Sequence, residues 1–108
     1  MNQTLQKDIK ALNELSLVRY LTILGYTPVH SGDDSTLYRM YLDQKDLQDM
    51  LIDHEANEFI DIAGNRKGNL VDFACLLFGI TPEELCSNIM PYRIDLLMRQ
   101  HTPQEVIA

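Results

Sequence analysis

Residues 64–73 read Gly64-Asn65-Arg66-Lys67-Gly68-Asn69-Leu70-Val71-Asp72-Phe73, and they separate a strand-rich half of this 108-residue chain from a helical half. The glycines and the polar residues between them predict a tight loop over residues 64–69. Asn69 is a residue type that caps helices, and the apolar residues after it recur at helical spacing. The stretch therefore predicts a loop that leads directly into a helix, with Leu70 and Phe73 on its buried side.

The residues after this loop predict further helices. Gly79 is the expected end of the first helix, since glycine accepts the left-handed backbone of a helix end. Thr81-Pro82-Glu83-Glu84 is a strong helix start, with a cap residue, a proline at the first helical position and the glutamate of a capping box. Pro91 opens another short helix that runs through Leu96 and Leu97.

The residues before the loop predict strands. Residues 36–42 are rich in aromatic and β-favouring side chains, and residues 50–53 and 58–62 are two shorter runs of the same kind. The polar residues 54–57 join the last two runs as a hairpin turn. Three short strands in succession favour an antiparallel sheet.

Two helices are expected at the N-terminus. Apolar residues recur at helical spacing over residues 4–12, and Ser16 caps a second helix that ends at Gly25. The order of helices, then strands, then helices predicts an α+β fold in one domain, residues 1–108. We expect a small antiparallel sheet of three to four strands, packed with flanking N- and C-terminal helices.

Alternation along the first predicted strand assigns residues to two faces of the sheet. One face carries Leu37, Arg39 and Tyr41, and the other carries Tyr38, Met40 and Leu42. Ile60 and Ile62 are expected to join Met40 in the core. Phe59 and Leu51 would then lie on the open face.

The predicted open face has two interpretations. Aromatic side chains such as Tyr41 and Phe59 beside Arg39 can stack unpaired bases of a nucleic acid. The same face can equally be covered by the first helix or contact a protein partner. The residues alone leave these alternatives open.

The loop before the third helix is a second candidate site. Arg66 and Lys67 add positive charge beside a helix N-terminus at Asn69, and this combination suits a phosphate or a carboxylate. The alternative is a plain turn with a solvated basic pair. The glycine spacing matches neither a P-loop nor a dinucleotide fingerprint.

The charge balance limits the classes of partner. The chain has 9 Lys and Arg against 16 Asp and Glu, a net charge of −7, which argues against general binding of nucleic acid or anionic membranes. Seven of the acidic residues lie within residues 43–61, where Lys45 is the only basic residue. The acidity therefore belongs mainly to one segment, and it does not argue against anion binding at the Arg66-Lys67 turn.

No catalytic arrangement stands out. His30, His54 and His101 have no neighbours at a recognised metal-ligand spacing, and Cys75 and Cys86 lie in stretches that read as helical. We expect reduced thiols, no cofactor and no enzymatic activity. The polar N-terminus is unlike a signal peptide, and no apolar run is long enough to span a bilayer, so a cytoplasmic protein without membrane contact is expected.

Several segments resemble, in the same order, the CHC2-type zinc-binding domain of bacterial DnaG-like primases, most closely the shortened versions in mobile-element primase and mobilisation proteins. Residues 16–29 are similar to its opening helix and turn, and Leu37-Tyr38-Arg39 looks like the strand before its first ligand pair. Met50-Leu51-Ile52-Asp53 looks like its Phe-x-Val strand. Residues 68–73 look like its Gly-rich turn and the helix after it. The resemblance covers about residues 15–88 and leaves a helical extension over 89–108.

The ligands of that family are not retained. Its Cys-x2-His and Cys-x2-Cys pairs, about 17 residues apart, fall on Met40, Asp43, Asp61 and Gly64. Methionine and glycine do not make a tetrahedral zinc site with two carboxylates, so we expect no zinc. Packing would have to replace the folding energy of the metal. The candidates for that packing are Met40, Ile60, Ile62 and Phe73.

The resemblance implies a non-catalytic accessory module that contacts single-stranded DNA or replication and mobilisation proteins, because catalysis in that family lies in a separate Toprim-type domain. Its basic and aromatic residues would map onto Arg39, Tyr41, Arg66 and Lys67. The alternative is a protein-interaction or regulatory module that binds no nucleic acid. A homodimer through the helical C-terminus is a further option.

Overall fold

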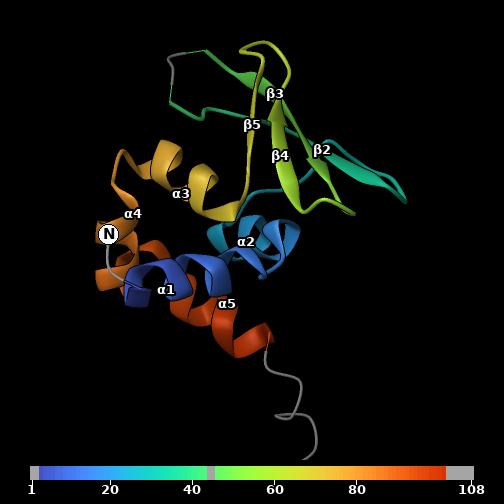
Figure 1. Cartoon of the computed structure of the whole chain (residues 1–108). Helices are drawn as coiled ribbons and strands as arrows, with labels where there is room; N and C mark the ends of the chain where they lie inside the picture. Colours follow the sequence, from blue (N-terminus) through green and yellow to red (C-terminus); the bar gives the residue numbers. More distant parts are fainter. Residues whose placement is uncertain (1–2, 44–45, 102–108) are drawn as a thin grey trace, which may run out of the picture.

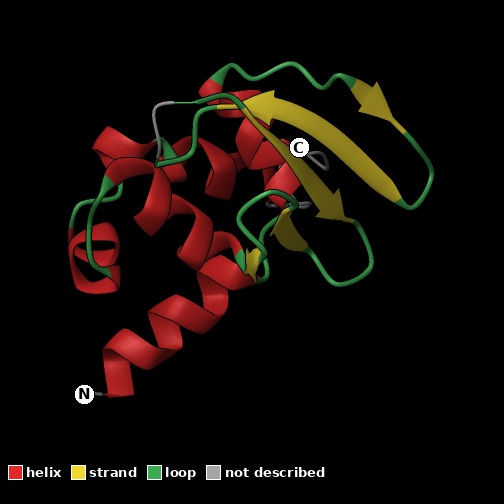
Figure 2. Ribbon diagram, turned by 90° about the horizontal axis from the view of Figure 1, so that it is seen from above, coloured by secondary structure: helices red, strands yellow, loops and turns green. Residues whose placement is uncertain are grey.

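The computed structural model describes residues 3–43 and 46–101 and has an α+β fold. In chain order its elements are the helices α1 (Gln3–Asn13) and α2 (Leu17–Leu24), the strands β1 (His30–Ser31), β2 (Ser35–Met40), β3 (Gln48–Asp53), β4 (Glu58–Asp61) and β5 (Arg66–Gly68), the helices α3 (Leu70–Phe78) and α4 (Pro82–Ser87), the 3-10 helix η1 (Met90–Tyr92) and the helix α5 (Ile94–His101). Figures 1 and 2 show the helices grouped on one side of the molecule and the strands on the other.

The strands form one antiparallel sheet in the order β1-β2-β3-β4-β5. The predicted fold class is confirmed, with a strand count slightly above the expected three to four. The additional strands are the short edges β1 and β5. Residues 66–68 were expected within a loop, and that prediction is wrong, because they pair with β4 through the register Phe59↔Gly68 and Asp61↔Arg66.

The helix starts follow the local chemistry of the sequence. The Ser16 hydroxyl accepts a hydrogen bond from the backbone N–H of Arg19 and caps α2. Asn69 forms a reciprocal capping box with Asp72 at the start of α3. Thr81 and its partner Glu84 do the same at α4. Each box satisfies two backbone donors that would otherwise lack partners, so all three predicted caps are confirmed.

The core lies between the inner face of the sheet and the helices. The Phe73 ring of α3 packs edge-on against Phe59 of β4, with centroids 5.9 Å apart, and against Tyr20 of α2, with centroids 6.2 Å apart. Ile94 and Leu97 of α5 are fully buried in the same core. The C-terminal segment therefore packs as part of the core as far as Leu97. Residues 102–108 of the predicted extension lie outside the described residues.

The side chains of β4 face the opposite sides of the sheet from those predicted. Phe59 and Asp61 are each 1% exposed and face the core, whereas Ile60 is half-buried on the opposite face and Ile62 is 56% exposed. The expectation that Ile60 and Ile62 join Met40 in the core is therefore wrong. On the inner face the Phe59 ring packs against Phe73 of α3, and Asp61 is reached by its hydrogen-bond donors Gln48 and Arg66. The predicted burial of Met40 and Phe73 is confirmed.

Within residues 3–43 and 46–101, no helix combines the length and the apolar character that crossing a bilayer requires.

Candidate functional site

One guanidinium joins two carboxylates at the end of the sheet. Arg66, the first residue of β5, donates from both terminal nitrogens to the two oxygens of Asp43, at 2.8 and 2.9 Å. The same side chain donates from Nε and Nη2 to one oxygen of Asp61, at 3.1 and 2.8 Å. Planar arginine is suited to such paired contacts with carboxylates. Arg66 thereby links the segment after β2, the end of β4 and the start of β5.

Asp61 is almost completely buried, and its charge is compensated by several donors. Besides Arg66, the side-chain amide of Gln48 donates to it at 3.2 and 3.4 Å, and the backbone N–H of Gly64 donates at 3.2 Å. A buried carboxylate is tolerated when its partners are charged and well placed. The hydrogen bonds from Arg66 also hold the pKa of the more exposed Asp43 below its ordinary value.

Three of the four positions at which the resemblance would put zinc ligands belong to the hydrogen-bond network of this arginine, and the fourth, Met40, is paired with Gln48 of that network. Asp43 and Asp61 bind Arg66 directly, the N–H of Gly64 binds Asp61, and Met40 is the register partner of Gln48. These residues do not fit a zinc ion. Both carboxylates already bind the guanidinium, and a side-chain carbon at Gly64 would clash with the Asp61 carboxylate. Among the described residues, no group of three or more His, Cys, Asp or Glu is placed to hold a metal.

Three residues of the predicted nucleic-acid face are now placed. Arg39 is exposed and forms an ion pair with its register partner Asp49, at 2.9 Å. Tyr41 is 54% exposed. The prediction that Phe59 lies on the open face is wrong, because this ring is buried against Phe73.

The predicted anion-binding loop is occupied by groups of the chain itself. Asn69 binds Asp72 through both its side chain and its backbone N–H, and the N–H of Gly64 binds Asp61. Arg66 is held by its two carboxylates. Lys67 is exposed on the outer face of β5, opposite Ile60 in the register. A groove of about 650 Å³ runs between this edge and α3 and is lined in part by Arg66, Lys67 and Asp72.

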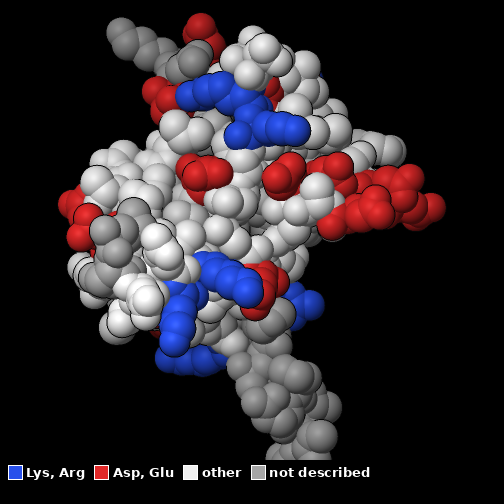
Figure 3. All heavy atoms as spheres, viewed as in Figure 1, with Lys and Arg blue, Asp and Glu red and all other residues white. Residues whose placement is uncertain are grey.

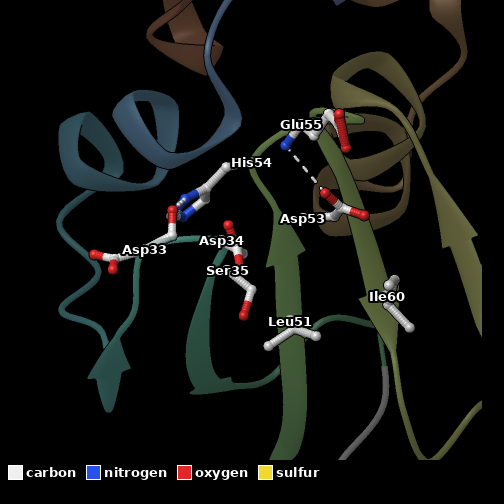
Figure 4. Close-up of a pocket in the computed structure, with 8 residues that line it drawn as sticks. All are labelled: Asp33, Asp34, Ser35, Leu51, Asp53, His54, Glu55 and Ile60. Atoms are coloured by element: carbon white, nitrogen blue, oxygen red, sulfur yellow. Dashed lines mark hydrogen bonds between the residues drawn. The ribbon is translucent and has the colours of Figure 1, made fainter.

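The outer face of the sheet carries a row of apolar side chains. Leu37, Leu51 and Ile60 are register neighbours on β2, β3 and β4, and all three are half-buried. Beside this row lies a hollow of about 610 Å³. Its lining residues are labelled in Figure 4: Asp33, Asp34, Ser35, Leu51, Asp53, His54, Glu55 and Ile60. Figure 3 shows acidic side chains gathered at this end of the sheet.

His54 fixes the two loops that border the hollow. Its Nδ1–H donates to the backbone carbonyl of Asp33 at 3.0 Å, and its Nε2 lies 2.6 Å from the Thr36 hydroxyl, with which it shares a hydrogen bond. Its backbone N–H donates to the carbonyl of Asp34 at 3.0 Å. The acidic residues on both loops are thereby held in place relative to each other.

The cysteines have the electrostatics of structural thiols. Burial is the main cause that raises the pKa of Cys75 to about 11, and burial also raises the pKa of Cys86. A nucleophilic cysteine needs a lowered pKa, because the thiolate is the reactive form. These shifts run in the opposite direction.

Comparisons of the chain with protein-family models, with curated proteins and with solved structures each gave no match.

Proposed function

We propose that this chain is a non-catalytic binding module of the primase zinc-binding type, in which an arginine has taken the place of the metal. Its role would be that of a cytoplasmic accessory that contacts replication or mobilisation proteins. The observation that carries the proposal is Arg66, whose guanidinium lies between Asp43 and Asp61, two of the four positions that would hold zinc. A cation is thus kept at this point of the fold, although it is supplied by a side chain.

The choice of a protein partner over nucleic acid rests on charge. Of the four basic and aromatic positions suggested by the resemblance, Arg39 and Arg66 are each bound to carboxylates. The hollow on the outer face of the sheet is bordered by aspartate and glutamate. Such a surface repels the phosphate backbone, whose neutralisation by Lys and Arg supplies most of non-specific DNA binding.

A direct test of the relationship is to rebuild the zinc site. In the variant M40C/D43H/D61C/G64C/R66S, four ligands replace the present side chains, and the competing guanidinium is removed. We expect one tightly bound zinc per chain, measured by elemental analysis after dialysis. The matched control M40S/D43H/D61C/G64C/R66S lacks one ligand and should lose the metal on the same dialysis. Equal zinc in both variants, or in neither, would argue against the relationship.

The binding role is tested with the proteins encoded beside this chain. Co-expression with a neighbouring Toprim-type protein, relaxase or helicase should give a complex that survives gel filtration. Failure of every such neighbour to co-purify, together with a strict monomer in light scattering, would count against a protein-binding module.

A second candidate function, contact with single-stranded DNA, is favoured by one observation. Lys67 is exposed beside the groove between β5 and α3, and the described residues supply no ion pair to it. Titration of a labelled oligonucleotide in low salt tests this candidate, with Lys67→Ala as the variant and Lys10→Ala on α1 as a matched control. Binding with a dissociation constant of tens of micromolar, weakened by Lys67→Ala and not by Lys10→Ala, would establish contact with single-stranded DNA.

A further inference from the structure

The outer face of the sheet is an apolar surface that no described element covers. Leu37, Leu51 and Ile60 stand side by side across three strands, about 5 Å apart in the hydrogen-bonding direction. Each is half-buried, whereas the residues before and after them point to the core. This row could accept two or three apolar side chains of a partner.

The acidic residues beside the row repel one another. Asp53 and Glu58 are direct register partners on β3 and β4, and like charges in that position destabilise a sheet. Asp33, Asp34 and Glu55 lie close by, on the loops that border the hollow (Figure 4). Within residues 3–43 and 46–101, none of these five carboxylates has an ion-pair partner. The fold therefore keeps a like-charged pair that no described Lys or Arg side chain neutralises.

This surface is already organised in the free chain. His54 joins the β3–β4 turn to the loop of Asp33 and Asp34 through two hydrogen bonds and to Thr36 of β2 through a third. The Asp53 carboxylate accepts the backbone N–H groups of Glu55 and Ala56, at 3.0 and 3.2 Å, which fixes the turn itself. Because these loops are already ordered, binding a partner here costs little conformational entropy, and this favours affinity.

The edges of the sheet are less suited to a partner than its face. The edge strands β1 and β5 have two and three residues. Strands this short offer few main-chain hydrogen bonds to an added strand. A partner segment is therefore expected to lie across the outer face.

We propose that this face, formed by Leu37, Leu51 and Ile60 together with Asp33, Asp34, Asp53, Glu55 and Glu58, is the docking surface for a short basic amphipathic segment of a partner protein. Its apolar side chains would cover the Leu37–Leu51–Ile60 row, and its Lys or Arg side chains would pair with Asp53 and Glu58. The inference rests on the proposed protein-binding function and specifies the chemistry of the partner. The five carboxylates would repel a phosphate backbone from this end of the face, so a basic segment is the better match in charge. A second copy docked head-to-tail would instead form a ring or an open-ended assembly, which light scattering detects.

The experiment selects peptides without assuming a sequence. Random twelve-residue peptides displayed on phage are selected on the immobilised full chain in low salt. The selected peptides are then titrated in solution by fluorescence anisotropy against the wild type and variants. We expect selected peptides that combine Lys or Arg with spaced apolar residues, and an affinity that falls with added salt.

The key variant is D53N/E58Q, which removes the like-charged pair but keeps hydrogen-bonding groups of the same shape. It should bind the selected peptides about tenfold more weakly, because two charge contacts are lost, while its thermal unfolding temperature stays the same or rises. The control D8N/E14Q removes two exposed charges, one from α1 and one from the turn after it, and should leave the affinity unchanged. A second variant, L51S, tests the apolar row and should also weaken binding.

Three results would overturn the inference. The first is that the selected peptides are acidic or neutral. The second is that wild type and D53N/E58Q bind the peptides with equal affinity. The third is that the wild type forms oligomers in light scattering and D53N/E58Q does not, which would make a second copy the occupant. The first two leave the proposed function intact if a neighbouring protein still co-purifies. Loss of that co-purified complex would instead remove the proposed function itself.

Discussion

The side chain of Asn57, in the β3–β4 turn, accepts a hydrogen bond from the backbone N–H of Leu17, 40 positions earlier in the chain, at 2.9 Å. Its amide also donates to the backbone carbonyls of Leu15, at 2.7 Å, and Asn13, at 3.2 Å. These three backbone groups lie where α1 ends and α2 begins. A single turn residue of the sheet therefore provides hydrogen-bond partners for the three backbone groups between two helices.

Asn57→Ala should lower the free energy of unfolding by about 2–4 kcal/mol, because three partly buried hydrogen bonds are lost and the left-handed backbone at φ 54° becomes strained. Asn57→Gly loses the same bonds but tolerates this backbone, so it should cost about 1 kcal/mol less than Asn57→Ala. Urea unfolding followed by circular dichroism measures both variants. Equal losses would mean that backbone strain plays no part.

Arg66→Met should be one of the most destabilising substitutions of a polar residue in this chain. It leaves the buried Asp61 without its charged partner, and breaking such a pair costs about 3–5 kcal/mol. Arg39→Met is the matched control, because its exposed pair with Asp49 is worth about 0–1 kcal/mol. The double variant R66M/D61N should recover part of the loss. Similar losses for Arg66→Met and Arg39→Met in urea unfolding would contradict this account.

Gly68→Ala should destabilise the protein by about 1–3 kcal/mol through overpacking. The added carbon would lie 2.7 Å from Cβ and 2.6 Å from Oδ2 of Asp72, the residue that completes the capping box of α3. In an Asp72→Gly background this neighbour is absent, so Gly68→Ala should cost much less. A double-mutant cycle measures the coupling between the two sites. Additive effects would show that the close approach is not the cause.

Acid should weaken the link between Asp43 and Arg66. The folded-state pKa of Asp43 is lowered from its ordinary value of 3.8, chiefly by hydrogen bonds from Arg66. Its contribution to stability is therefore complete above that ordinary value, and it is lost as the pH falls through the lower, folded-state pKa. The difference in unfolding free energy between wild type and Asp43→Asn should be constant near neutral pH and shrink below about pH 4. A difference that grows on acidification would reverse the sign of this prediction.

Cys75 should react slowly with alkylating reagents in the folded protein. With a pKa of about 11, only about one thiol in a thousand is ionised at pH 8. Mass spectrometry after timed exposure to iodoacetamide checks this, with the urea-unfolded chain as the reference for full reactivity. Rapid modification of Cys75 in the folded protein would point to a reactive thiol.

The helices were predictable because their signals are local. Ser16, Asn69 and Thr81 each lie next to the backbone groups that they cap, so a few residues of sequence contain the whole interaction. The phase of β4 was not predictable in this way. In the sequence alone, two isoleucines on one side of the strand favour burial of that side over the side with one phenylalanine. The correct assignment requires knowledge of the buried partners of Phe59 and Asp61.

The candidate sites also differ in whether their contacts are local in the sequence. The contacts of Arg66 reach Asp43, 23 positions away, and depend on the pairing of β5 with β4, so no local pattern indicates them. The pair of Asp53 and Glu58, in contrast, is predictable from the sequence. A hairpin turn over residues 54–57 already places these two side chains opposite each other.

The cation between Asp43 and Asp61 belongs to the polypeptide, and this has a consequence for how the domain is maintained in the cell. A guanidinium on a side chain cannot be removed by a chelator, displaced by a competing ion or released when neighbouring thiols are oxidised. Its local concentration is set by the covalent chain, so this point of the fold forms without any metal from the surroundings.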